Sequence, residues 1–222
     1  MSLGRTGKHS SWAYAEDHSE DDPVLQAARR RAAELGSAAV SSGTAAALSV
    51  LAATLGARAL AEVGTGVGVS GTALLRGAGK GAVLTSIDAD ANHIAAAAET
   101  FRAEGIPASK TRLITGDAAR VLPRLNSGGY DLVFIDAEPQ DVVDYAAEGI
   151  RLIRSGGALI INDALDQDRV PRPAVRDEST QAMREVERLL RDDQQLVTAL
   201  LPAGTGLLVA VNGAEATLPR PR

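Results

Sequence analysis

The sequence predicts an α/β fold in which helices cover both faces of a mostly parallel sheet that ends in an antiparallel hairpin. Short apolar runs alternate with longer helix-compatible segments, and a helical crossover is what joins parallel strands. The runs LVFID and ALIIN are apolar almost throughout, as strands buried on both faces are. Near the C-terminus two apolar runs flank only residues 202–206, and so short a connection joins antiparallel neighbours.

The length of 222 residues suits one well-buried domain. We expect residues 23–213 to form it, between a flexible N-terminal arm, residues 1–22, and a C-terminal tail, residues 214–222. The arm is rich in Gly, Ser and His and ends in acidic residues, a composition that favours disorder.

Composition excludes several classes of function. The formal net charge of −5 provides no basic surface, so we expect no nucleic-acid partner. The absence of cysteine excludes disulfides, thiolate metal sites and cysteine nucleophiles. No run approaches the roughly 20 apolar residues of a membrane span, and the N-terminus is polar where a secretion signal would be apolar. We therefore expect a soluble, cytoplasmic protein with no membrane partner.

Two helices come before the first strand. Pro23 suits a first helical turn, apolar residues then recur at helical spacing, and Gly36 ends the segment. A second helix is expected over Thr44–Leu55. The strands are expected over residues 59–63, 83–88, 112–115, 132–136 and 158–162, with the hairpin over residues 195–212.

The segment AEVGTGVGVSG places a glycine turn between the first strand and a helix. Its pattern Gly66-x-Gly68-x-x-Gly71 allows close approach of a ligand to unpaired N–H groups at the helix start. The alternative is a turn that only packs the helix on the strand. Asp88 ends the next strand, where an acid accepts hydrogen bonds from a ribose diol. A nicotinamide dinucleotide and S-adenosylmethionine share that ribose.

Glu62 favours the second ligand. A carboxylate repels a pyrophosphate but pairs with the ammonium of the methionine portion. Ser70, at the helix start, either donates to the methionine carboxylate or only caps the helix.

Five ordered motifs carry a resemblance to a known family. AEVGTGVGVSG, LTSIDAD, ITGDA, YDLVFIDAE and LIRSGGALIINDAL, within Val40 to Val211, resemble the small class I S-adenosylmethionine-dependent O-methyltransferases. That group includes catechol and caffeoyl-CoA O-methyltransferases, and the chain is most similar to a bacterial branch of it. The resemblance implies a Rossmann-like methyltransferase fold whose seven-stranded sheet has one antiparallel strand near its end.

The resemblance also implies a set of cofactor-binding residues. Gly116, Asp117 and Ala118 would lie along the adenine, and Tyr145 matches a family tyrosine, although it could equally pack on the sheet. The histidines His9, His18 and His93 form no constellation, and we assign them no chemistry. The cofactor-binding residues would be Val40, Glu62, Gly64, Thr65, Gly66, Ser70, Asp88, Ala89, Gly116, Asp117, Ala118, Asp136 and Tyr145.

The reacting end is expected where neighbouring strands finish. Asp136 ends LVFID, Asn162 and Asp163 end ALIIN, and ligands of open α/β sheets lie at the carboxyl ends of strands. Their oxygens suit Mg²⁺ or another divalent cation. The alternative is that Asp136 and Asp163 bond local backbone. Metal-dependent members of the family carry Asp-Asn where this chain has Asn162-Asp163, and Pro139 replaces a lysine that often serves there as base.

The sequence thus predicts an O-methyltransferase that moves the methyl group of S-adenosylmethionine to a hydroxyl of a small phenolic or catechol-like molecule. Asp136 and Asp163 are the candidate catalytic residues, and the loop from Asp166 to Asp177 is a candidate lid or else a solvated connector. The alternatives are an NAD(P)-dependent oxidoreductase and a catalytically silent S-adenosylmethionine-binding protein. Family resemblance and a long N-terminal helix suggest a homodimer.

Overall fold

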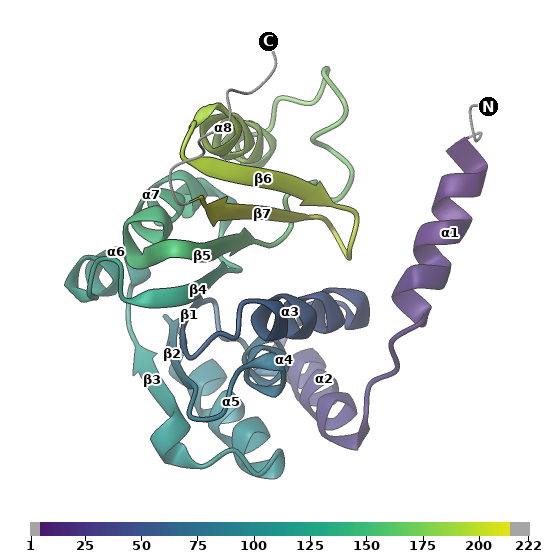
Figure 1. Cartoon of the computed structure of the whole chain (residues 1–222). Helices are drawn as coiled ribbons and strands as arrows, with labels where there is room; N and C mark the ends of the chain where they lie inside the picture. Colours follow the sequence, from purple (N-terminus) through teal and green to yellow (C-terminus); the bar gives the residue numbers. More distant parts are fainter. Residues whose placement is uncertain (1–4, 214–222) are drawn as a thin grey trace.

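A seven-stranded sheet forms the centre of the protein (Figure 1). The structure, a computed structural model, describes residues 5–213, with side chains from residue 10 onward. The expected tail, residues 214–222, lies outside the described residues. The strands are β1 (Ala59–Val63), β2 (Val83–Asp88), β3 (Thr111–Thr115), β4 (Tyr130–Ile135), β5 (Ile153–Ile161), β6 (Leu196–Leu201) and β7 (Leu207–Asn212).

The strand order is β3-β2-β1-β4-β5-β7-β6, with β7 antiparallel to both of its neighbours and all other pairs parallel. This confirms the predicted fold, including the C-terminal hairpin. A dinucleotide-binding sheet of order 3-2-1-4-5-6 lacks an inserted antiparallel strand, so the topology argues against the oxidoreductase alternative.

Two strands begin earlier than expected. β4 starts at Tyr130 and β5 at Ile153, and the pairing between them shifts register after Tyr130. In β5 the difference arises at the Gly156-Gly157 pair, which resembles a turn in the sequence but forms an irregularity inside the strand. Gly156 has a φ of +75°. At the other end the expected strand limits nearly hold, because Asp136 and Asn162 directly follow β4 and β5.

Helices cover both faces of the sheet. One apolar cluster joins alternate strand residues such as Leu60 to α2 (Pro23–Leu35), α3 (Ser42–Thr54), α4 (Val69–Gly77) and α5 (Ala91–Ala103). The other joins the intervening residues, such as Ala61, to α6 (Ala118–Val121), α7 (Val142–Leu152) and α8 (Glu178–Asp192). Alternation of side chains along each strand therefore splits the core in two. Within residues 5–213, no helix is long and apolar enough to cross a bilayer.

The expected N-terminal arm contains a helix. α1 (Arg5–Asp17) stands apart from the layered body, opposite the edge at which β4 and β5 end (Figure 1). Its Glu16 accepts hydrogen bonds from the N–H groups of Gly43, at 3.2 Å, and of Gly204 in the β6–β7 turn. The composition of this segment predicts an irregular arm. The structure instead has a helix, whose Glu16 contacts parts of the chain that are distant in sequence.

Candidate cofactor and acceptor site

The glycine turn after β1 lets neighbouring backbone, and a ligand, come close to its own backbone. Gly64, Gly66 and Gly68 have φ values of +82°, +50° and +85°, a region that favours glycine. A Cβ on Gly64 would lie 1.7 Å from the backbone oxygen of Asp136. The turn therefore packs directly against the end of β4, and this brings the expected cofactor turn next to the expected acceptor residues.

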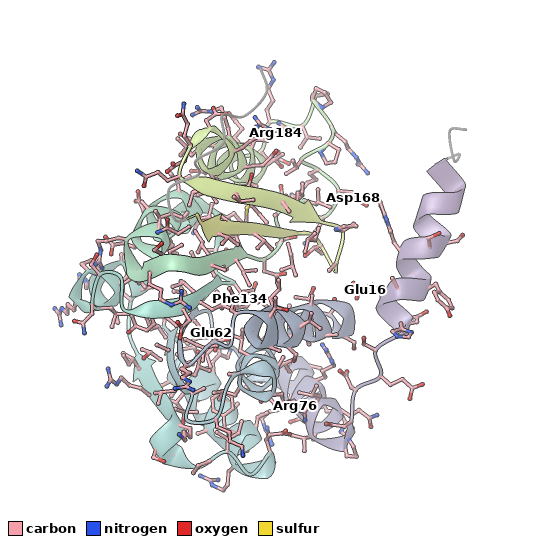
Figure 2. All side chains as sticks on the ribbon, viewed as in Figure 1. Glu16, Glu62, Arg76, Phe134, Asp168 and Arg184 are labelled. Carbon is pink, nitrogen blue, oxygen red and sulfur yellow. The ribbon has the colours of Figure 1, made fainter. Side chains whose placement is uncertain are left out.

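Glu62 lies inside the molecule, beneath this turn (Figure 2). It has 0% of its surface exposed, and its carboxylate accepts hydrogen bonds from Ser70 and, at 2.5 Å, from Ser86. Thr65 and Ser86 share a further hydroxyl contact. Burial raises the pKa of Glu62 to about 7. Ser70 donates its hydroxyl to Glu62, so Glu62 links the end of β1 to the start of α4 on either side of the turn.

Asp88 lies at the end of β2, where the sequence predicts a ribose acid. Its oxygens accept hydrogen bonds from the N–H groups of Gly66, at 2.8 Å, and Asp90, at 2.9 Å. The Nδ1 atom of His93 lies 3.2 and 3.3 Å from the two oxygens. Sequence reasoning missed His93; the available signal was its place in the first turn of the helix that follows Asp88.

The expected adenine side is formed by neighbouring elements. Gly116 donates its N–H to the backbone oxygen of Asp88, at 2.9 Å, and Asp117 caps α6 through the N–H of Ala119. Tyr145 lies on the buried face of α7, and burial together with the charges of Asp141 and Asp117 raises its pKa. Of the remaining expected residues, Ala118 and Val40 are buried and Ala89 is exposed.

Asp136 and Asn162 meet directly after β4 and β5. Asp163 follows, with its carboxylate hydrogen-bonded to Thr205 and, at 3.4 Å, to the N–H of Gln167. The amide nitrogen of Asn162 donates to Asp136 at 2.9 Å. Burial raises the pKa of Asp136 to about 6 against the effect of that hydrogen bond, and the charge of Asp163 adds to the rise. Asp163 has a φ of +52°, and burial raises its pKa as well. Pro139, at the position of the family lysine, begins a short 3-10 turn, Pro139–Asp141.

One polar atom at this edge has no partner. The side-chain oxygen of Asn162 is buried without a hydrogen bond, whereas its nitrogen bonds Asp136. In the part of the chain described, no cluster of three or more His, Cys, Asp or Glu side chains could hold a metal. A cation at this edge would therefore need the amide oxygen of Asn162 as its third ligand.

The loop from Asp166 to Asp177 is fastened rather than loose. Asp166 is fully buried and accepts hydrogen bonds from Arg169, Ser179 and Thr180. Burial alone would raise its pKa, but these hydrogen bonds hold it below the usual value. From α8, the Arg184 guanidinium donates to loop carbonyls (Figure 2), namely those of Arg169, Val170, Arg172 and Val175.

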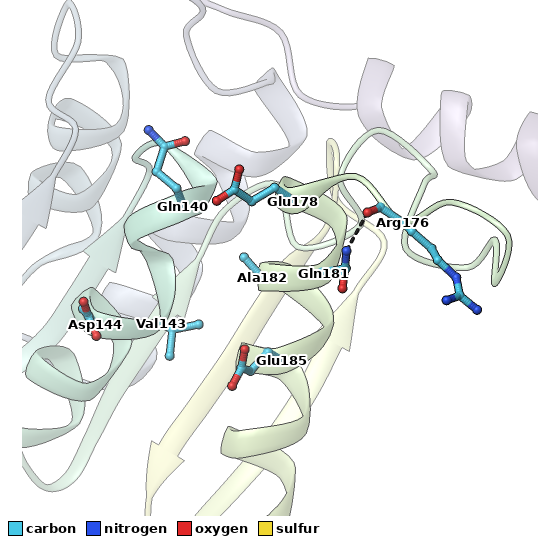
Figure 3. A pocket seen from close by; sticks show the side chains of 8 residues that line it. All are labelled: Gln140, Val143, Asp144, Arg176, Glu178, Gln181, Ala182 and Glu185. Atoms are coloured by element: carbon cyan, nitrogen blue, oxygen red, sulfur yellow. Dashed lines mark hydrogen bonds between the residues drawn. The ribbon is translucent and has the colours of Figure 1, made fainter.

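A separate groove of about 470 Å³ lies between α7 and α8 (Figure 3). Gln181 donates to the backbone oxygen of Arg176 at one end of it. Acidic side chains line much of the rest, namely Asp144, Glu178 and Glu185. None of the residues predicted to bind cofactor, acceptor or metal lines this groove.

Known proteins resemble this chain over nearly its whole length. A family model described as O-methyltransferase matches residues 15–212. A Mycobacterium ulcerans protein named as an O-methyltransferase is 48% identical over 199 residues, 90% of this chain and 89% of that protein. A crystal structure from Corynebacterium glutamicum has a TM-score of 0.87 and 30% identity, covering 96% of this chain and 100% of its own.

A further crystal structure shares the fold. The O-methyltransferase TomG from Streptomyces achromogenes, in complex with S-adenosylmethionine, is 22% identical with a TM-score of 0.83, covering 96% of this chain and 100% of its own. The family match confirms the resemblance that the five sequence motifs carried. On this evidence the chain belongs to the O-methyltransferase family.

Proposed function

We propose that this protein transfers the methyl group of S-adenosylmethionine to a hydroxyl of a small phenolic or catechol-like molecule. The contact between Gly64 and the end of β4 carries the proposal, because it sets the glycine turn beside Asp136. Methyl transfer is an in-line displacement that needs the acceptor oxygen close to the sulfonium carbon. A new carbon–oxygen bond forms, the carbon–sulfur bond breaks, and S-adenosylhomocysteine leaves.

The cofactor would lie along the ends of β1, β2 and β3. Asp88 would accept the ribose diol, and the N–H groups at the start of α4 would face the methionine carboxylate, since a helix N-terminus favours an anion. Glu62 would act through the turn, because Ser70 and Ser86 already bond its two oxygens. The adenine would lie beside Gly116, Asp117 and Ala118.

Asp136 and Asp163 would handle the acceptor hydroxyl. A carboxylate whose pKa is raised to about 6, as for Asp136, is a stronger base than an ordinary aspartate. It can therefore take a phenolic proton more readily at neutral pH. Pro139 cannot accept a proton, so the lysine common in the family has no counterpart at that position.

The residues at this edge fit a divalent cation. Asp136, Asn162 and Asp163 offer oxygen ligands of the kind that Mg²⁺ prefers, and the unpartnered oxygen of Asn162 supports such a role. When bound, a cation would lower the pKa of an acceptor hydroxyl as a Lewis acid. Asp136 and Asp163 would then orient the acceptor, and full activity after exhaustive EDTA treatment would contradict the metal assignment.

A labelled-methyl assay over a panel of phenols and catechols, with and without Mg²⁺, tests the proposal. We expect transfer to at least one catechol, and we expect Mg²⁺ to restore activity lost to EDTA. Calorimetric titration with S-adenosylhomocysteine and with NADH runs beside it, and only the first should bind. No transfer to any acceptor, together with binding of S-adenosylhomocysteine, would favour the catalytically silent alternative.

Two parts of the proposal concern the state of the protein in the cell. We infer a homodimer from the family resemblance and from the N-terminal helix α1, which stands apart from the layered body. Light scattering of the full chain tests it. A cytoplasmic location agrees with the absence of cysteine, and cell fractionation tests that part.

A further inference from the structure

His93 faces the proposed ribose acid from the first turn of α5. Its Nδ1 atom lies 3.2 Å from one oxygen of Asp88 and 3.3 Å from the other. The near-equal distances mean that the imidazole faces the carboxylate as a whole. The His93 side chain is 22% exposed, so one side of it borders solvent.

The acceptor capacity of Asp88 is nearly used up in this arrangement. A carboxylate offers about four lone-pair positions, two on each oxygen. The N–H of Gly66 takes one position on Oδ2, and the N–H of Asp90 takes one on Oδ1. One position remains on each oxygen, and Nδ1 of His93 is within reach of both. Because a carboxylate only accepts, Nδ1 carries the proton of this contact.

A ribose diol needs the same two positions, one on each oxygen. We propose that His93 and the cofactor ribose compete for Asp88, so that the imidazole must turn away before the diol can bind. The inference rests on the proposed cofactor role of Asp88. The Asp88–His93 contact holds the carboxylate in place, and its loss when the ribose binds lowers the net affinity for the cofactor.

Calorimetric titration of S-adenosylhomocysteine into three variants tests the competition. His93→Ala removes the competing donor, and affinity should increase by about threefold to tenfold, the worth of one net hydrogen bond. His93→Asn places an amide N–H where Nδ1 was, so its affinity should stay close to that of the parent protein. Asn92→Ala, an exposed neighbour in the same helical turn, serves as the matched control and should change nothing.

A spectroscopic readout follows the imidazole itself. The chain has three histidines, so the imidazole nitrogen signals of His93 can be identified by their loss in His93→Asn. Saturation of the parent protein with S-adenosylhomocysteine should shift these signals as the contact with Asp88 breaks. His93 signals that do not move at saturation would overturn the inference.

The outcomes separate this inference from the cofactor assignment. If His93→Ala binds S-adenosylhomocysteine equally or more weakly while Asp88→Ala loses affinity, the competition is wrong and the ribose role of Asp88 stands. If the parent protein does not bind S-adenosylhomocysteine at all, both are wrong.

Discussion

Glu62 is a carboxyl group with no exposed surface and two hydroxyl partners. Its pKa is raised from 4.5 to about 7, so between these values the folded protein binds more protons than the unfolded chain. The free energy of unfolding therefore loses a contribution as pH rises through this window. The protonated form of Glu62 is the one that stabilises the fold. Its contribution to the free energy of unfolding is complete below the unfolded pKa of 4.5.

Glu62→Gln should remove that pH dependence. The amide keeps an acceptor for one hydroxyl and cannot ionise, so the variant should gain on the parent protein as pH rises. Between pH 5 and pH 8 the difference in unfolding free energy should move in favour of the variant by on the order of 2 kcal/mol. Denaturant unfolding at both pH values measures it, and parallel profiles would show that Glu62 ionises as freely as in the unfolded chain.

Asp88 is the residue on which the proposed binding of the cofactor depends most. Asp88→Ala removes the proposed charge-assisted hydrogen bonds to the ribose and leaves the N–H of Gly66 without its partner. Affinity for S-adenosylhomocysteine should fall by roughly tenfold to a hundredfold. Calorimetry gives the value beside Asn92→Ala, and unchanged affinity would remove Asp88 from the site.

At the scale of elements, the loop from Asp166 to Asp177 depends on one side chain of α8. Arg184 donates to four of its carbonyls, so Arg184→Met, which keeps an apolar stem, should release the loop. Hydrogen exchange of the loop amides should quicken by at least about tenfold.

Arg188→Met is the matched control for that experiment. Arg188 lies one turn further along α8, is 55% exposed and pairs with Asp192 at 3.7 Å. Exchange in the loop should stay as in the parent protein, because exposed ion pairs contribute little. Equal exchange in both variants would mean that Asp166, and not Arg184, holds the loop.

Glu16 joins α1 to two distant elements, the start of α3 and the β6–β7 turn. Glu16→Ala removes both hydrogen bonds, and amide exchange in α1 should accelerate by about tenfold or more. Asp17→Ala, at the neighbouring exposed position, should leave exchange unchanged. Slow exchange in Glu16→Ala would show that other contacts hold α1 in place.

The elements that sequence predicts well are those set by local pattern. Continuous apolar runs gave the central strands, and Pro23 and Gly36 bounded α2, where Asp22 caps the first turn and Gly36 adopts a φ of +66°. β5 began earlier than expected because Gly156 and Gly157 fit either a turn or an irregular strand. The helix in the arm was missed because the contacts of Glu16 reach residues far away in the chain.

In the candidate site too, local sequence pattern predicts some features and long-range contacts determine the others. The location of Asp88, Asp136, Asn162 and Asp163 could be predicted, because each lies at or just after the end of a strand and strand ends of a parallel sheet share one edge. The side-chain contacts around the site could not be predicted. His93 bonds Asp88, Ser86 bonds Glu62 and Arg184 bonds carbonyls of the loop after Asp163, and no periodic pattern encodes contacts of this kind.

At the scale of the whole molecule, the strand order places the proposed cofactor-binding residues and the proposed acceptor residues at the same edge of the sheet. The glycine turn follows β1 and Asp88 ends β2, while Asp136 and Asn162 directly follow β4 and β5. The inserted β7 supplies, with β6, the turn on which the segment after Asp163 rests, since Ala164 and Leu165 donate to its carbonyls. The fold thereby holds the proposed cofactor and acceptor groups side by side.

Methyl transfer by the parent protein and by Asp136→Asn, with S-adenosylhomocysteine affinity measured in parallel, tests this account most directly. Asn has nearly the same shape as Asp but cannot take a proton or carry charge. We predict that the parent methylates a catechol. The variant should lose at least about a hundredfold in rate, because Asn supplies neither a general base nor a charged ligand for a cation, while it still binds S-adenosylhomocysteine. Equal transfer by both proteins would contradict the claim that the acceptor is activated at the ends of β4 and β5.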